Sequence, residues 1–183
     1  MKMKNSMKKK AIFFDRDGVV NRRLNDYVKS IDEFVFDKYF FELFQLINPM
    51  GFISILVTNQ QCVNKGIITE AKLHEIHNFM QEQLLENTNH CFTEIYFSPA
   101  LANSGDKFRK PEPGMFISAI NKYNIAPEDS WTIGDSITDV EAGKKVGTKT
   151  ILIGHFEDIK EADFIFRSLK EVLHFFRNHN RDN

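Results

Sequence analysis

Short apolar runs alternate with amphipathic stretches along most of this chain, and this alternation is the feature that most limits its fold. Runs rich in β-branched and aromatic residues predict buried strands, and apolar residues at helical spacing predict helices between them. Because strands and helices alternate, successive strands run parallel and the helices cover both faces of the sheet. The sequence therefore predicts an α/β fold with a doubly wound, mainly parallel sheet.

The boundaries of these elements follow from where the apolar runs begin and end. The expected strands are Ala11–Phe14, Phe52–Val57, Glu94–Phe97, Trp131–Gly134, Thr150–Ile153 and Asp163–Phe166. The expected helices are Phe40–Ile47, residues 70–85 after a Thr69 cap, Gly114–Tyr123, Ile137–Val146 and residues 168–176. The long polar connection from Ser98 to Lys110 is of a length that is often functional.

The length of the chain limits its domain organisation. With 183 residues, 42% of them hydrophobic, it can form one substantial core but not two. We expect a single domain over residues 11–177, a disordered basic tail over residues 1–10 and a loose tail over residues 178–183. No insertion of about 50 residues or more separates the predicted elements, so we expect no large cap domain.

Charge and cysteine content exclude several classes of partner. The net charge of −1 gives no general basic field for nucleic acid or an anionic membrane. No stretch approaches the roughly 20 apolar residues that cross a bilayer. The two cysteines, Cys62 and Cys91, are isolated and fit a reducing compartment. We therefore expect a cytoplasmic monomer that binds neither nucleic acid nor membranes.

Two aspartates, Asp15 and Asp17, directly follow the first predicted strand, and Gly18 then turns the chain. If the extended geometry persists past Phe14, both carboxylates face one small volume at the carboxyl end of the strand. Open parallel sheets bind their ligands at this end. Two like charges so close favour a bound cation, or a charged carboxylate beside a protonated one. An ordinary acidic turn is the alternative interpretation.

Polar residues also follow the other predicted strands. Thr58 and Asn59 can present a hydroxyl, an amide and backbone N–H groups to phosphate oxygens. Lys110 is restrained by the proline that follows it. Asp135 offers a second carboxylate for the cation, and Asp139 lies one helical turn further on. Each residue alone has an ordinary interpretation, but together they suit one phosphate group and one Mg²⁺ ion.

These motifs, in this order, resemble those of the haloacid dehalogenase-like (HAD) superfamily of aspartate-dependent phosphohydrolases. They stand in this chain as Phe13-Phe14-Asp15-Arg16-Asp17-Gly18, Val57-Thr58-Asn59, Lys110-Pro111 and Ile133-Gly134-Asp135-Ser136-Ile137-Thr138-Asp139. The finer pattern is similar to the branch of heptose bisphosphate phosphatases and histidinol-phosphate phosphatases, with the heptose enzymes more similar. The resemblance implies a Rossmann-like fold.

The resemblance also implies a role for each matching residue. Asp15 would be the nucleophile that forms an aspartyl-phosphate, and Asp17 the acid and base, which holds a proton before reaction. Mg²⁺ would be bound by Asp15, Asp135 and the backbone carbonyl of Asp17, with Asp139 in support. The expected substrate- and phosphate-binding residues are Asn21, Thr58, Asn59, Gln60, Arg109 and Lys110.

Two segments depart from the pattern of this branch. Its second motif usually continues with small residues and an arginine-glycine pair, whereas this chain has Gln61-Cys62-Val63-Asn64-Lys65-Gly66. The branch also commonly carries a zinc loop of three cysteines and a histidine before the Arg-Lys-Pro triplet. Residues 98–108 contain none of these ligands, so we expect no zinc. His74 and His77 lack a third ligand nearby and are interpreted as structural.

The expected function is a Mg²⁺-dependent phosphomonoesterase acting on a small phosphorylated sugar such as D-glycero-D-manno-heptose 1,7-bisphosphate. A histidinol-phosphate phosphatase and a nucleic-acid 3′-phosphatase are the alternatives among enzymes. The near-neutral charge disfavours the nucleic-acid substrate. A non-catalytic binder of a phosphorylated ligand is the alternative from another class, and it would have no need of a second acid at Asp17.

Overall fold

A computed structural model of the chain describes residues 7–157 and 159–179. Much of the two expected tails, residues 1–6 and 180–183, lies outside the described residues. The first strand already begins at Lys10, and the last helix continues to His179. These two elements therefore begin and end slightly outside the expected limits of residues 11 and 177.

The described residues form one six-stranded sheet in the order β3-β2-β1-β4-β5-β6, and every strand pair is parallel. The strands are β1 (Lys10–Phe14), β2 (Phe52–Asn59), β3 (Glu94–Ser98), β4 (Trp131–Gly134), β5 (Lys149–Ile153) and β6 (Phe164–Phe166). The α-helices are α1 (Phe40–Ile47), α2 (Glu70–Thr88), α3 (Gly114–Tyr123), α4 (Ile137–Val146) and α5 (Leu169–His179). Short 3₁₀ helices span Ile31–Glu33, Asn48–Met50 and Pro127–Asp129. This is the predicted doubly wound α/β fold.

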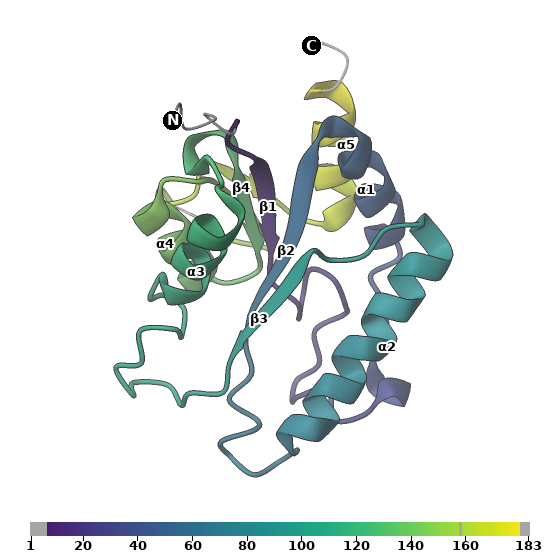
Figure 1. Cartoon of the computed structure of the whole chain (residues 1–183), viewed down its shortest axis with the longest axis vertical. Coiled ribbons are helices and arrows are strands. Elements are labelled where there is room, and N and C mark those ends of the chain that lie inside the picture. Colours follow the sequence, from purple (N-terminus) through teal and green to yellow (C-terminus); the bar gives the residue numbers. More distant parts are fainter. Residues whose placement is uncertain (1–6, 158, 180–183) are drawn as a thin grey trace, which may run out of the picture.

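The helices cover both faces of the sheet, with α3 and α4 on one face and α1, α2 and α5 on the other (Figure 1). Alternate residues of β1 divide between two cores. Ile12 and Phe14 belong to the core under α1, α2 and α5, and Ala11 and Phe13 belong to the core under α3 and α4. All four side chains are fully buried. The strand that leads to Asp15 is therefore held on both sides.

Two predicted boundaries shift for identifiable reasons. Strand β2 continues two residues past the expected end, because Thr58 and Asn59 pair with Phe97 and Ser98 of β3. Helix α2 continues to Thr88 and stops where Asn89 adopts a left-handed conformation with φ of 58°. Asparagine is one of the few residues other than glycine that tolerate this conformation at a helix end.

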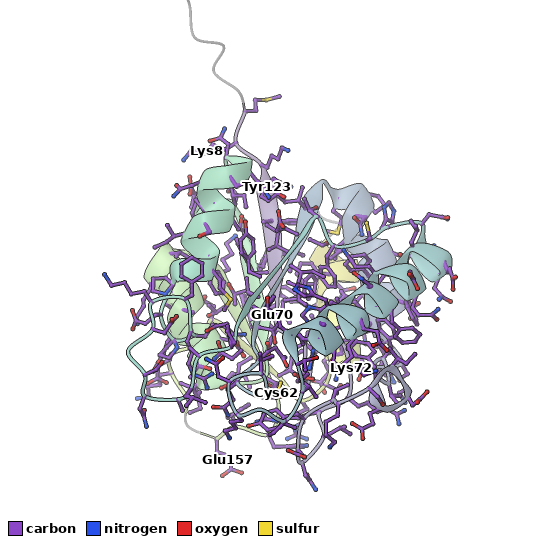
Figure 2. The ribbon with its side chains drawn as sticks, turned by 60° about the horizontal axis from the view of Figure 1, so that its bottom comes forward. Lys8, Cys62, Glu70, Lys72, Tyr123 and Glu157 are labelled. Atoms are coloured by element: carbon purple, nitrogen blue, oxygen red, sulfur yellow. The ribbon has the colours of Figure 1, made fainter. Side chains whose placement is uncertain are left out.

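The loops that follow the strands gather at one end of the molecule, at the bottom of Figure 1. Figure 2 shows Cys62, from the loop after β2, near this end and far from Lys8 and Tyr123 at the other. The sheet therefore brings the four predicted motifs together at its carboxyl edge.

No helix in the described part of the chain is long and apolar enough to cross a membrane.

Candidate active site

A cavity of about 940 Å³ opens at the carboxyl edge of the sheet. Its wall is formed by residues from the loops after β1, β2, β3 and β4, so every predicted motif contributes to it. Asp15, Asp17, Thr58, Lys110 and Asp135 all line this one space. A cavity of this size can enclose a small phosphorylated molecule.

Asp15 is placed by the end of β1 and by its neighbour β4. Its backbone N–H donates to the carbonyl of Ile133 at 2.9 Å, which continues the parallel pairing by one residue. The side chain is 12% exposed, and its Oδ1 accepts a hydrogen bond of 2.8 Å from Lys110 Nζ. A carboxylate oxygen is therefore presented to the cavity beside a fixed positive charge.

Lys110 is buried, with only 2% of its side chain exposed. Its ammonium group donates to Asp15 and to the carbonyl of Val57 at 2.6 Å, and it forms an ion pair of 2.6 Å with Asp139 Oδ1. Burial alone would lower the pKa of Lys110, but Asp139 and Asp15 raise it above its ordinary value. The lysine therefore stays charged at neutral pH.

Asn59 bonds to the backbone of Lys110 through both ends of its side-chain amide. Its amide Nδ2 donates to the carbonyl of Lys110, and its Oδ1 accepts from the N–H of Lys110, both at 3.0 Å. This two-bond clamp joins the end of β2 to the loop before α3, and it uses both ends of the amide. Asn59 thus positions Lys110, and both Asn59 and Thr58 line the cavity.

Asp17 lies in a cluster of hydrogen-bond donors. Its carboxylate accepts from Arg16 at 3.0 Å, from Asn21 Nδ2 at 3.0 Å and from Gln60 Nε2 at 2.9 Å. Burial alone would raise the pKa of Asp17, but the charge of Arg16 and the bonds from Asn21 and Gln60 hold it below its usual value. In this state Asp17 is ionised, whereas the resemblance implies a protonated acid.

The two aspartates differ because the chain turns directly after β1. The carbonyl of Arg16 accepts from the N–H groups of Val20 and Asn21, at 2.9 and 3.1 Å, so the extended geometry ends before Asp17. Asn21 and Gln60, which the sequence predicts to contact substrate, are 0% and 1% exposed and bond to Asp17 from behind. Their geometry is that of positioning residues.

Arg16 is a functional residue that the sequence reasoning does not single out. Its side chain is fully buried and contacts both oxygens of Asp17. On its far side, Nη1 lies 3.3 Å from Nε2 of His77 in α2, which is itself 3% exposed. An arginine between two aspartates indicates in the sequence that it can pair with one of them. Nothing in the sequence around Arg16 indicates its contact with His77 of α2.

Three carboxylates at the cavity floor form a candidate metal centre. One ligand oxygen from each of Asp15, Asp135 and Asp139 lies within 4.8 Å of the others. A Cβ at Gly18, which has φ of +89°, would lie 1.9 Å from Asp135 Oδ2, so only glycine lets this carboxylate approach. A hard, all-oxygen ligand set on a constrained backbone fits Mg²⁺. The carboxylate of Asp17 is directed to its own donors instead.

Asp135 lies in surroundings that disfavour its ionised form. Burial and then the negative charge of Asp15 raise the pKa of Asp135 to about 6, against the opposing charge of Arg23. Asp139 also closes a capping box at the start of α4, because its Oδ2 accepts from the N–H of Ser136 at 3.0 Å. The helix cap thereby fixes the carboxylate that pairs with Lys110.

Gln61 and Arg109 line the cavity and bond to residues of the segment 98–108, which departs from the family pattern. Gln61 donates to the hydroxyl of Tyr27 at 2.9 Å and accepts from the N–H of Ala102 at 3.3 Å, so it joins three loops. Arg109 donates to the carbonyl of Ala100 at 2.7 Å. The loop that replaces the zinc loop is thus held by side-chain to backbone hydrogen bonds.

Comparisons with known proteins agree with this geometry. A family model described as HAD-hydrolase-like matches residues 107–172. The chain is 32% identical over 173 residues to a D-glycero-alpha-D-manno-heptose-1,7-bisphosphate 7-phosphatase of Campylobacter jejuni, covering 93% of this chain and 98% of that protein. It is 31% identical over 179 residues to a D-glycero-beta-D-manno-heptose-1,7-bisphosphate 7-phosphatase of Haemophilus ducreyi, covering 91% and 98%.

A solved structure has the same fold over nearly its whole length. It is a D,D-heptose 1,7-bisphosphate phosphatase from B. bronchiseptica, complexed with magnesium and phosphate, at a TM-score of 0.82 and 25% identity. The match covers 93% of this chain and 99% of that one. The chain therefore belongs to the D-glycero-D-manno-heptose-1,7-bisphosphate 7-phosphatase family of HAD-like phosphatases.

Proposed function

We propose that this protein hydrolyses the 7-phosphate ester of D-glycero-D-manno-heptose 1,7-bisphosphate. The observation that carries the proposal is the contact of 2.8 Å between Asp15 and the buried Lys110, next to the carboxylates of Asp135 and Asp139, inside one cavity. The names of the relatives support the substrate, and they include both anomers of the sugar. A cytoplasmic location and a monomeric state stay predictions from the sequence.

Asp15 supplies the nucleophile. One of its oxygens forms a bond to phosphorus while the bond from phosphorus to the ester oxygen breaks, which leaves a phosphorylated aspartate. A carboxylate and a phosphate oxygen at 4 Å repel by about 4 kcal/mol per pair of unit charges at an effective dielectric constant of 20. The ammonium group of Lys110, already in contact with Asp15, offsets this repulsion on the side of the incoming phosphate.

Mg²⁺, when bound by Asp15, Asp135 and the backbone carbonyl of Asp17, supplies further positive charge to the transferring oxygens. Thr58 lines the same space and offers a hydroxyl to a phosphate oxygen. Asn59 acts through its clamp on the backbone of Lys110. These residues orient the phosphoryl group in line with the attacking carboxylate.

Asp17 moves the protons. A phosphate dianion beside it opposes its ionisation, so substrate binding favours the protonated form that the free enzyme disfavours. The acid then gives its proton to the leaving sugar oxygen, and as a carboxylate it takes one from the water that attacks the phosphorylated Asp15. Inorganic phosphate leaves, and both aspartates return to their starting states.

Steady-state kinetics on a substrate panel test this proposal. The panel contains both anomers of the heptose bisphosphate, histidinol phosphate and an oligonucleotide with a 3′-phosphate, all with Mg²⁺. We expect kcat/KM to be highest for one or both heptose anomers and to fall about a thousandfold or more in Asp15→Asn, which lacks the nucleophile.

Asp129→Asn is the matched control, since it removes one exposed carboxylate in the segment that leads into β4, away from the cavity. It is expected to retain kcat within about twofold. Turnover in Asp15→Asn equal to that of the native enzyme would exclude the covalent mechanism. Equal rates on every member of the panel would exclude the heptose assignment.

A further inference from the structure

Arg23 extends over the candidate metal centre from the loop after β1. Its Nη1 forms an ion pair of 3.0 Å with Oδ2 of Asp135. The arginine side chain is 66% exposed, whereas that of Asp135 is only 12% exposed. A largely solvated guanidinium group therefore reaches into the cavity to contact a nearly covered carboxylate.

The carboxylates at the cavity floor are paired with positive side chains. Arg16 pairs with Asp17, and Lys110 pairs with both Asp15 and Asp139. At the candidate metal centre, Asp135 forms its ion pair with Arg23. Arg23 and a divalent cation thus compete for the same carboxylate.

A bound cation changes what Arg23 can do. A divalent cation at Asp15 and Asp135 neutralises both carboxylates and repels the guanidinium group of Arg23. Arginine is well suited to bind phosphate, because its fork donates two parallel hydrogen bonds to an anion. Two other cations on the cavity wall are engaged with neutral partners, since Lys65 donates to the hydroxyl of Tyr27 and Arg109 to a backbone carbonyl.

We propose that Arg23 neutralises Asp135 while the metal site is empty, and that metal binding releases it to bind a second anionic group of the substrate. This inference rests on the proposed function, because it needs a substrate with two phosphate groups and a divalent cation at Asp135. It assigns the discrimination between a bisphosphate and a monophosphate to Arg23. An exposed ion pair of ordinary kind would have neither effect.

Magnesium binding to the full chain tests the first half. The variants are Arg23→Gln and its neighbour Arg22→Gln, which removes the same charge from an exposed residue. Isothermal titration calorimetry with MgCl₂ alone, at low ionic strength, is expected to give about threefold to tenfold tighter Mg²⁺ binding for Arg23→Gln. In this variant no guanidinium group competes with the cation for Asp135. Arg22→Gln is expected to bind like the native protein. Equal affinities for the two variants would overturn the competition.

Substrate discrimination tests the second half. We would measure kcat/KM for the heptose 1,7-bisphosphate and for the matched heptose 7-phosphate, which lacks the second anion. The ratio of the two values is expected to fall about tenfold in Arg23→Gln and to stay constant in Arg22→Gln. An unchanged ratio in Arg23→Gln would overturn the recognition role.

The two measurements separate this inference from the proposed function. If the native enzyme hydrolyses neither sugar phosphate, the proposed function fails, along with the recognition role assigned to Arg23. The titration with MgCl₂ requires no turnover, so it still decides whether Arg23 competes with the cation. If the native enzyme is active but Arg23→Gln leaves the ratio of the two kcat/KM values unchanged, the proposed function stands and the role of Arg23 in recognition fails.

Discussion

At the residue scale, Asp15 and Asp17 are two residues apart but have distinct electrostatic surroundings. Asp15 faces the cavity and one ammonium group, whereas Asp17 is held by an arginine and two amides. Asp15 thus keeps an oxygen that can attack phosphorus, and Asp17 stays ionised until the phosphate group of the substrate binds beside it. A buried chain from His77 through Arg16 to Asp17 maintains this difference.

His77 predicts a pH-dependent stability. Burial and then the charge of Arg16 lower the pKa of His77 from 6.5 to about 3. Between these values the unfolded chain binds a proton that the folded chain does not, so stability rises with pH and is lost as the pH falls below about 6.5. The loss approaches about 1.4 kcal/mol per pH unit. Urea unfolding of the native protein at pH 7.5, 6.5 and 5.5 measures it.

The comparison variant is His77→Gln, whose side-chain carbonyl can accept from Arg16 but does not titrate. The quantity of interest is the difference between the two proteins in unfolding free energy, because groups such as Asp135, which titrates in the opposite sense, then cancel. This difference is expected to shift by about 1 kcal/mol between pH 7.5 and 5.5. A constant difference would mean that His77 has the same pKa in the folded and the unfolded protein, which would contradict the lowered pKa.

The positions of the site residues could be predicted from sequence, but not all their partners could. Parallel strands bring their carboxyl ends to one edge, so residues such as Thr58 and Lys110 meet wherever the sheet forms. Which atom an amide faces depends on rotamers and on neighbours far along the chain. The sequence predicts that Asn59 and Gln60 bind substrate or phosphate, and it does not predict that their amides bond to Lys110 and Asp17.

At the scale of elements, three loops form the rim and one side chain joins them. Gln61, after β2, bonds to Tyr27 from the loop after β1 and to Ala102 from the loop after β3. Lys65 also donates to the Tyr27 hydroxyl at 2.8 Å. The side-chain bonds of Gln61 and Arg109 thus restrain residues 98–110, where relatives of this branch commonly use a zinc loop.

Removing this link is expected to loosen the rim. In Gln61→Leu, a side chain of similar size loses both hydrogen bonds, so the loop after β3 samples more conformations. We expect KM for the heptose bisphosphate to rise about threefold to tenfold, with a smaller change in kcat. Limited trypsin digestion is expected to cut faster after the exposed Lys107.

Gln83→Leu is the control for this change, because the half-buried Gln83 does not line the cavity and its side chain donates to Glu86 of the same helix α2. It is expected to match the native protein in both assays. Cleavage after Lys107 at the native rate in Gln61→Leu would show that the loop does not depend on this link.

The periodicity of apolar residues in the sequence predicts the type of each helix and strand well, but it predicts their ends less well. The cores of β1, β4, α3 and α4 lie where the sequence predicts them, because buried apolar runs and caps have local signatures. The end of β2 depends on pairing with β3, and the end of α2 depends on Asn89, whose left-handed conformation is only one of its options. The three 3₁₀ helices had no periodic signal to predict them.

At the scale of the whole molecule, β1 and β4 are the two strands at the centre of the sheet, and the loops that follow them carry Asp15 and Asp135. Each pairs with a strand on both sides, and residues of both are buried between the helical layers. The residues proposed for the chemistry thus depend on the most enclosed part of the fold. The rim loops depend on a few hydrogen bonds near solvent.

Amide hydrogen exchange should separate these two regions. Peptides that contain β1 and β4 are expected to exchange close to the rate set by global unfolding, because their hydrogen bonds are buried on both sides. Peptides from residues 99–108 are expected to exchange by local opening, at least about a hundredfold faster. Equal protection of the two regions, measured by mass spectrometry at neutral pH, would contradict this division.

The pairing of β1 with β4 has a consequence for when the candidate metal centre exists. Asp15 directly follows β1 and Asp135 directly follows β4, and these two strands pair with Phe14 opposite Ile133. Carboxylate oxygens of Asp15 and Asp135 lie within 4.8 Å of each other because their strands are neighbours in the sheet. A cation held by both carboxylates therefore binds the folded sheet and not the unfolded chain, and such a ligand stabilises the fold by mass action.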